Sequence, residues 1–327
     1  MVLMAADRRE EAIEWADRAL EVRPGYRLAV LHKADALIQL GRLDEAVGLL
    51  EHELAATEVA AYAGLLQSIA SERDDAVAAL AALEEFRRRQ PLLEQGGIGA
   101  YQARRADLLL RLGDLAGASE AAALSNSFFH KEVAARLSAP GAAERRRVRL
   151  NVPFVRQHHL TCAPATLAAL SAFWGRPANH LEIAEKICYD GTPHFHQRVW
   201  AEQNGFVVAE FTVSYSVTKA VIDAGIPFAM ATTEPTSSHL QAVIGYDDRN
   251  GVVIMRDPTS SHFTEALAEP YFLRFGATGP LGMILIPAEE ASRLEGLDLP
   301  DRHLHDLAHA LAGSLETHQR DEAARCF

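Results

Sequence analysis

The sequence predicts an α+β protein in which an all-helical first part precedes a domain with an antiparallel sheet. Two observations carry this prediction. From Asp7 to about Leu137 the chain is rich in alanine, leucine and glutamate, with apolar residues at helical spacing. After residue 150, helical segments alternate with short apolar runs that are typical of strands. We therefore expect a helical domain at 1–140, a second domain at 148–290 and a helical tail at 291–327.

Proline and histidine usage supports a boundary between the two parts. Pro24 and Pro91 are the only prolines before residue 140, and eleven of the fourteen histidines lie beyond residue 150. Residues 138–150 combine Pro140 and Gly141 with a short basic run, which is typical of a linker that leads into a strand. A length of 327 residues agrees with two domains.

The charge balance excludes several classes of partner. Aspartate and glutamate total 44 against 32 lysines and arginines, a formal net charge of −12, which does not favour nucleic-acid phosphates or anionic lipid. No run of about eighteen uncharged apolar residues is present, and charged residues begin at Asp7, too early for a signal peptide. Three cysteines are too few for a disulfide framework. We expect a soluble, cytoplasmic protein with no membrane segment and no nucleic-acid partner.

A short sequence motif recurs in the helical part. Residues 41–46 and 113–118 both read Gly-x-Leu-x-x-Ala, in which glycine suits the left-handed end of one helix and alanine permits close packing of the next. This region resembles tetratricopeptide repeats over about the first 135 residues, and the residues that fit are Ala12, Ala19, Pro24, Gly41, Ala46 and Gly113. The resemblance implies a concave surface for a peptide or a protein partner. A plain helical bundle that binds nothing is the alternative.

The second domain mixes two hydrophobic periodicities. Helices are expected at 162–174, 179–188, 194–204 and 216–224. Strands are expected at 206–213, 226–232, 240–246, 251–255 and 282–287. Asp247 to Gly251 is a predicted hairpin turn, and the tail from Asp301 to Phe327 has the pattern of an amphipathic helix.

Cys162 is expected to lie where a loop becomes a helix. Thr161 suits the N-cap position, and Pro164 suits the first turn, where its missing amide costs nothing. The positive end of the helix dipole favours the thiolate, which is the nucleophilic form of cysteine. This position predicts a reactive cysteine.

Two further residues are candidates to assist this thiolate. His239 begins an apolar strand, and Asp257 follows the next strand, so a hairpin across residues 247–251 brings them to one end of the ladder. An aspartate beside a histidine fixes the tautomer and stabilises the imidazolium. Gln157, five residues before Cys162, is expected to donate its amide to an oxyanion, together with the Cys162 main-chain amide.

These residues form a recognisable order: Gln-x4-Cys-x-Pro-Ala, then His at the start of a strand ending in Gly-Tyr-Asp, then Asp-Pro. In this respect residues 148–290 resemble the papain-like bacteriocin-processing peptidases, a bacterial family that cleaves double-glycine leaders, and its stand-alone members. The resemblance implies a papain-like fold with Cys162 as nucleophile, His239 as base, Asp257 as orienting acid and Gln157 as oxyanion donor.

Other histidines of this domain are candidates for substrate contact. His158 and His159 are expected at the rim of the cleft. His194, His196 and Trp200 share one short helical segment, where His196 and Trp200 are expected to flank the substrate groove. The chain has no His-Glu-x-x-His helix, no Cys-x-x-Cys pair and no glycine-rich phosphate loop, so no metal and no cofactor are expected.

The sequence thus predicts a cysteine peptidase that acts on a peptide or protein substrate, with the helical repeats positioning that substrate. An acyl or peptidyl transferase would use the same acyl-enzyme and release it with an amine. A catalytically idle scaffold that binds protein is the third hypothesis, because a fold does not fix a function.

Overall fold

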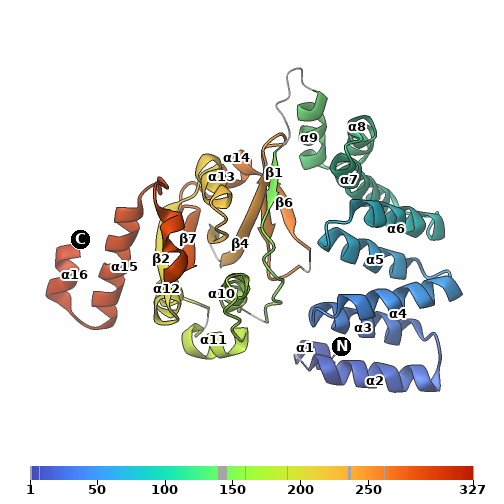
Figure 1. Ribbon diagram of the computed structural model, residues 1–327, viewed down its shortest axis with the longest axis horizontal. Helices are drawn as coiled ribbons and strands as arrows, with labels where there is room; N and C mark the ends of the chain where they lie inside the picture. Colours follow the sequence, from blue (N-terminus) through green and yellow to red (C-terminus); the bar gives the residue numbers. More distant parts are fainter. Residues whose placement is uncertain are drawn as a thin grey trace. The chain divides into compact units, whose positions relative to one another are not determined.

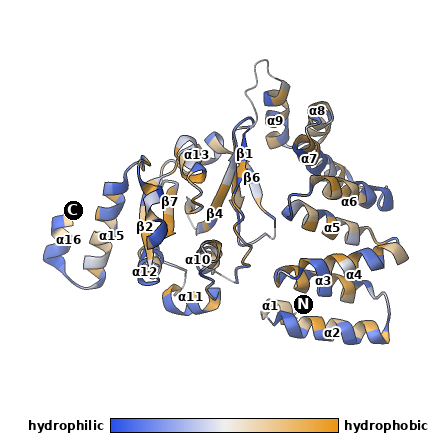
Figure 2. Ribbon diagram, viewed as in Figure 1, coloured by the Kyte–Doolittle hydropathy of each residue, from blue (hydrophilic) through white to orange (hydrophobic). Residues whose placement is uncertain are grey.

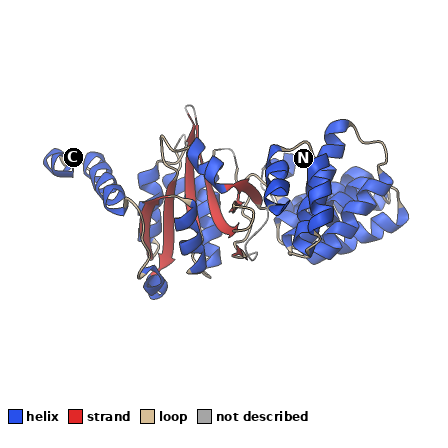
Figure 3. Cartoon of the chain, turned by 90° about the horizontal axis from the view of Figure 1, so that it is seen from above, coloured by secondary structure: helices blue, strands red, loops and turns tan. Residues whose placement is uncertain are grey.

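The structure, a computed structural model, describes residues 2–6, 8–138, 146–158, 160–189, 191–234, 237–260 and 262–326. The chain forms two compact units, Met1–Ala143 and Glu144–Phe327 (Figure 1). In the described ranges, the first unit consists of helices and loops, and every strand belongs to the second unit (Figure 3). This arrangement confirms the predicted α+β class.

Each helix of the first unit packs on the next helix in the sequence. The helices are α1 (Val2–Ala5), α2 (Arg9–Val22), α3 (Arg27–Gln39), α4 (Leu43–Ala56), α5 (Ala60–Glu72), α6 (Ala76–Arg89), α7 (Gln95–Leu112), α8 (Leu115–Leu124) and α9 (Phe128–Ser138). Their faces alternate between hydrophobic and hydrophilic residues (Figure 2), as expected for amphipathic helices that share a core.

The recurring motif Gly-x-Leu-x-x-Ala lies at two sharp turns between helices. Gly41 and Gly113 have φ angles of 73° and 84°, which most other residues avoid, and they end α3 and α7. Ala46 and Ala118, in the helices that follow, are 0% and 1% exposed. The motif therefore combines a turn at its glycine with close helix packing at its alanine, as the sequence predicted.

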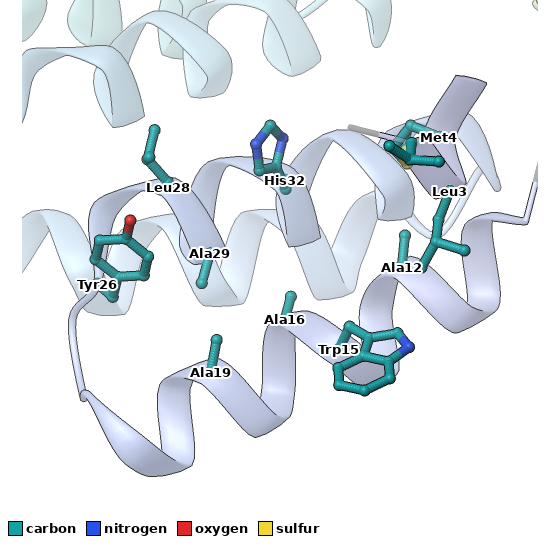
Figure 4. Close-up of a pocket in the computed structure, with 11 residues that line it drawn as sticks. Leu3, Met4, Ala12, Trp15, Ala16, Ala19, Tyr26, Leu28, Ala29 and His32 are labelled. Carbon is teal, nitrogen blue, oxygen red and sulfur yellow. The ribbon is translucent and has the colours of Figure 1, made fainter. Parts of the chain in front are cut away.

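The first unit contains a cavity of about 440 Å³ beside its first helices (Figure 4). Its lining is mainly apolar and comes from α1, α2 and the start of α3: Val2, Leu3, Met4, Ala12, Trp15, Ala16, Ala19, Tyr26, Leu28, Ala29 and His32. Large side chains at its edge are exposed, Trp15 to 58% and Leu28 to 44%. Small alanines on α2 leave the space that these larger residues surround.

The second unit is built on one antiparallel sheet. Its strands are β1 (Arg147–Arg149), β2 (Phe206–Thr212), β3 (Phe228–Glu234), β4 (Ser237–Asp247), β5 (Val252–Arg256), β6 (Thr264–Leu267) and β7 (Leu281–Pro287). The order is β2-β7-β3-β4-β5-β6, and β1 pairs with β4. Its helices are α10 (Cys162–Phe173), α11 (His180–Ile187), α12 (His194–Gln203), α13 (Tyr215–Asp223), α14 (Ala268–Arg274), the 3₁₀ helix η1 (Ala288–Leu294), α15 (Arg302–Glu316) and α16 (Arg320–Cys326).

Both faces of this sheet are buried. Along β4, Ala242 and Ile244 belong to the core under α10, α11 and α12, whereas Val243 belongs to the core under α13 and α14. This alternation follows the two-residue period of a strand. It explains why β5 is hydrophobic except for Arg256, and why β4 has a mainly apolar stretch from Leu240 to Tyr246 (Figure 2). The buried helix α10 is thereby fixed against the middle of the sheet.

The predicted helices and strands of this unit are present, with small shifts at their ends. The sequence did not predict α14 or the short strand β6, which pairs with β5. The predicted tail helix is two helices, α15 and α16, separated at His318, whose φ angle is 59°. In the described part of the chain, no helix is both long enough and apolar enough to cross a membrane.

Candidate active site

Cys162 is the first residue of α10. Thr161 occupies the N-cap position, but its hydroxyl accepts a hydrogen bond of 2.8 Å from the His158 main-chain N–H and does not cap the helix. The first N–H groups of the helix are therefore not capped by Thr161, and the main chain of Ala163 is hydrogen-bonded to the Cys162 side chain. Nine of the residues that follow Cys162 in α10 are buried, so the packing of this helix sets the position of the sulfur.

His239 and Asp257 lie at the same end of the β4–β5 hairpin. Ala242 pairs with Arg256, and Asp257 directly follows that residue. The ring Nε2 of His239 lies 3.1 Å from Asp257 Oδ2, and the Cys162 side chain is close enough to His239 for the two groups to shift each other's pKa. With Nε2 bonded to the carboxylate, Nδ1 is the ring nitrogen available to the sulfur.

Electrostatics favours an ion pair between Cys162 and His239. Burial raises the pKa of the Cys162 thiol, but hydrogen bonds with His239 and with the main chain of Leu240 and Ala163 outweigh it and lower the pKa below its ordinary value. Hydrogen bonds with Asp257 and Cys162 raise the pKa of His239 to about 9. Both shifts stabilise a thiolate next to an imidazolium.

The carboxylate of Asp257 is itself held in its ionised form. Burial raises its pKa, but hydrogen bonds from His239 and Thr259 lower it to about 2. The main-chain N–H and the hydroxyl of Thr259 donate to Oδ1 at 2.7 and 2.6 Å. Oδ1 and Oδ2 therefore face different partners, and the carboxylate cannot rotate without losing one of them.

Gln157 is connected to the same region through its main chain. Its N–H donates a hydrogen bond of 3.0 Å to the carbonyl of Pro258, the residue after Asp257. Its side chain is partly buried, and the Oε1 atom has no hydrogen-bond partner in the described ranges. Gln157 is not among the described residues that line the cavity discussed next.

A cavity of about 520 Å³ opens beside Cys162, within the range of ligand pockets. The residues that line it come from the start of α10, the start of α12, the β3–β4 hairpin and the start of β7. They are Leu160, Cys162, Ala163, Gly191, Thr192, His194, Gln197, Ala231, Thr233, Ser237, Ser238, Leu240, Thr278 and Leu281.

Two residues that the sequence predicted to flank the substrate groove, His196 and Trp200, do not line the cavity. Trp200 is 4% exposed and stacks on Phe206 in the core, so it does not reach the cavity. His196 lies outside the described lining, with its Nε2 atom 3.9 Å from Glu316. Residues two apart on a helix point roughly 200° apart, so the face with His194 and not the face with His196 borders the cavity.

Of the two histidines shortly before Cys162, only His158 is among the described residues. His158 packs edge-on against His180, with 5.5 Å between ring centroids, and it is not in the described lining of the cavity. His159 lies outside the residues that the structure describes.

Sequence reasoning missed two residues of this region, Thr259 and Gln197. The triplet Asp-Pro-Thr offers a signal for the first, because an aspartate at the start of a turn commonly binds the main chain two residues later. The second lies one helical turn after His194, on the same face. In the described residues, no group of three or more histidine, cysteine or acidic side chains is arranged to hold a metal ion.

Comparisons with known proteins agree with this class of site. Residues 149–275 match the model of the Peptidase_C39 like family, so this segment is similar to those peptidases. It contains Cys162, His239 and Asp257.

A solved structure is also similar to this chain. The peptidase domain of Streptococcus ComA, a bifunctional ABC transporter involved in a quorum-sensing pathway, is 22% identical over 42% of this chain and 98% of that chain, with a TM-score of 0.36. None of the curated proteins compared with the chain matches it.

Proposed function

We propose that this protein is a cysteine peptidase in which Cys162 attacks, His239 transfers the proton and Asp257 orients the imidazole. The observation that carries the proposal is the hydrogen bond of 3.1 Å between His239 and Asp257 next to Cys162, and the interaction of Cys162 with His239 lowers the pKa of the thiol and raises that of the imidazole. The match to a peptidase family supports a peptide or protein as substrate.

In the acylation step, the Cys162 thiolate attacks the carbonyl carbon of the scissile bond. The C–N bond then breaks, and the His239 imidazolium gives its proton to the leaving amine. Asp257 stabilises the imidazolium before this transfer and holds Nδ1 toward the sulfur throughout.

In the deacylation step, His239 acts as a base. It takes a proton from a water molecule, which attacks the thioester and releases the acid and the thiolate. An amine in place of water would give a coupled product, so the same residues serve the acyl-transfer alternative.

The negative oxygen formed in both steps needs hydrogen-bond donors. The main-chain N–H of Cys162 is at the first position of α10, where no carbonyl within the helix accepts it. We assign the second donor to the side-chain amide of Gln157. The bond from its main chain to Pro258 supports this role, because it holds Gln157 close to the segment that orients His239.

We assign the helical unit a role in positioning the substrate. Its cavity is apolar and has Trp15 and Leu28 exposed at the edge, which suits a hydrophobic stretch of a peptide. A second weak site on the same chain raises the apparent affinity for a long substrate through effective concentration.

Cleavage of a peptide library, followed by mass spectrometry, tests the proposed function. We expect hydrolysed products with the wild type and none with Cys162→Ala. Cys326→Ala, the same substitution near the end of the chain, is the matched control and should cleave as the wild type does. Products that persist in Cys162→Ala would contradict the proposal, and a majority of amine-coupled products would favour the transferase.

A further inference from the structure

Several polar side chains on the wall of the cavity beside Cys162 already have partners within the protein. The hydroxyls of Ser238 and Thr278 donate hydrogen bonds of 3.3 Å to main-chain carbonyls. Gln197 donates its amide to the carbonyl of Thr192, and its buried Oε1 atom has no surface open to the cavity. These side chains therefore have little left to offer a substrate.

His194 differs from them, because one of its ring nitrogens remains accessible. It is the first residue of α12 and belongs to the lining of the cavity. Its Nε2 atom lies 2.5 Å from Oε1 of Glu210. In the described part of the chain, its Nδ1 atom has no hydrogen-bond partner and is not buried, and the side chain is 35% exposed. A ligand in the cavity can therefore reach Nδ1.

Glu210 fixes which nitrogen of the ring carries the proton. Its side chain is 2% exposed, and burial raises its pKa, but hydrogen bonds with His194 and Arg198 outweigh burial and lower the pKa below its ordinary value. An ionised carboxylate only accepts hydrogen bonds, so Nε2 of His194 donates its hydrogen to Glu210. In the neutral ring, Nδ1 then keeps its lone pair and is an acceptor.

The same carboxylate holds the ring of His194 in place. Arg198 Nη1 lies 3.0 Å from Oε2 of Glu210 and 2.8 Å from Oδ1 of Asp306 in α15. Arg198 Nε lies 2.9 Å from Oε1 of Glu202. The imidazole is thus tied to β2, α12 and α15 through a series of polar contacts. An acceptor held in this way loses little conformational freedom when it binds a ligand.

A peptide main chain offers a donor to such an acceptor, because every residue except proline carries an N–H group. We propose that His194 is a substrate-binding residue, whose Nδ1 accepts a hydrogen bond from a main-chain N–H of the peptide within about three residues of the scissile bond. This inference rests on the proposed peptidase function. Because the contact is made to the main chain, it does not depend on the side chains of the substrate, and it helps to fix the scissile bond in register with Cys162.

Kinetics of the full-length protein with backbone-modified peptides test this contact. The parent is a peptide that the wild type cleaves in the library experiment. Each member of a series replaces one main-chain N–H near the scissile bond by an ester oxygen, and the scissile amide itself stays unchanged. His194→Gln keeps an amide that can donate to Glu210 but lacks the Nδ1 acceptor. His196→Gln, the same substitution on the same helix outside the described lining, is the control.

We expect one ester to lower kcat/KM of the wild type about tenfold, the effect of one lost hydrogen bond. His194→Gln should cleave the parent peptide about tenfold more slowly than the wild type, and that ester should cost it nothing further. The other esters should have the same effect on both proteins. N-methylation at the same position, which removes the N–H and leaves the carbonyl an amide, should also cost His194→Gln less than the wild type. His196→Gln should respond to every peptide as the wild type does.

Several outcomes would overturn the contact. A wild type that no ester slows, or an ester effect of equal size in the wild type and His194→Gln, contradicts it while leaving the peptidase proposal intact. If the ester is coupled to His194 but the N-methyl group is not, the ring binds a carbonyl, and the assignment of Nδ1 as acceptor is wrong. If circular dichroism shows that His194→Gln does not fold, His194→Ala is compared in the same way, and the wild-type series decides on its own when no ester has an effect. Failure of the wild type to cleave any peptide contradicts the proposed function, and this contact with it.

Discussion

The main-chain N–H of Gln157 donates a hydrogen bond of 3.0 Å to the carbonyl of Pro258, although the two residues lie on distant parts of the sequence. This bond joins the segment before Cys162 to the segment after Asp257. A shift of either segment would move the other, so the position of Gln157 and the orientation of His239 depend on one another.

Gln157→Ala keeps this main-chain bond and removes the side-chain amide. If that amide stabilises the oxyanion, kcat should fall by about 10²-fold with little change in KM, because the donor acts on charge that appears only in the transition state. Steady-state kinetics on a peptide identified by the library measures the effect. An unchanged kcat would show that another donor serves the oxyanion.

The pH dependence of turnover should follow the ion pair of Cys162 and His239. The pKa of His239 is raised to about 9, so the imidazolium is present below that pH and is lost above it. The pKa of Cys162 is lowered, so the thiolate persists at pH values where an ordinary thiol is protonated. We expect kcat/KM to decline on the alkaline side near pH 9. A decline near pH 6.5, the ordinary value for histidine, would contradict the ion pair.

Asp257→Asn tests the origin of that alkaline limit. The hydrogen bond with Asp257 makes the largest contribution to the raised pKa of His239, and the charge of Asp257 adds to it. The asparagine keeps the shape of the side chain but removes the charge and leaves a weaker, neutral acceptor. The alkaline decline should therefore move to lower pH, and the rate should drop. Alkylation of Cys162 with iodoacetamide at a series of pH values, with Cys326 as an internal reference, measures the change in the thiolate independently of turnover.

Thr259→Val should weaken the support of Asp257 without removing it. The hydroxyl that donates at 2.6 Å is lost, and the main-chain N–H that donates at 2.7 Å remains. We expect a several-fold fall in kcat, smaller than that of Asp257→Asn, and recovery in Thr259→Ser. A loss in Thr259→Ser as large as in Thr259→Val would point to altered packing and not to the hydroxyl.

A substitution in the cavity of the helical unit should raise KM for long substrates and not for short ones. Leu28→Asp places a charge at the edge of an apolar cavity, so KM should rise for a protein substrate and stay the same for a short peptide that occupies the cleft alone. Val22→Asp, at an 87% exposed position of α2 outside the lining, is the control. Equal effects on long and short substrates would assign the helical unit a structural role.

Much of the fold was predictable because local chemistry decides it. The helix that begins at Cys162 and the hairpin at residues 247–251 follow from short sequence patterns, and both are present. The turns at Gly41 and Gly113 follow from the need for a positive φ angle, which glycine adopts without strain. Strand β6 was not predicted, because a four-residue strand with polar residues has too weak a period to be recognised.

The sequence by itself predicted which residues are chemically suited to the site, since a cysteine at a helix start, a histidine near the start of one strand and an aspartate just after the next follow from patterns of neighbouring residues. Tertiary structure alone decided which other side chains surround the sulfur. The packing of α12 on the sheet turned Trp200 into the core and Gln197 toward the cavity, and a third segment supplied Glu210 behind His194. Helical periodicity gives the angle between side chains, but the direction of the whole helix is set by the core against which it packs.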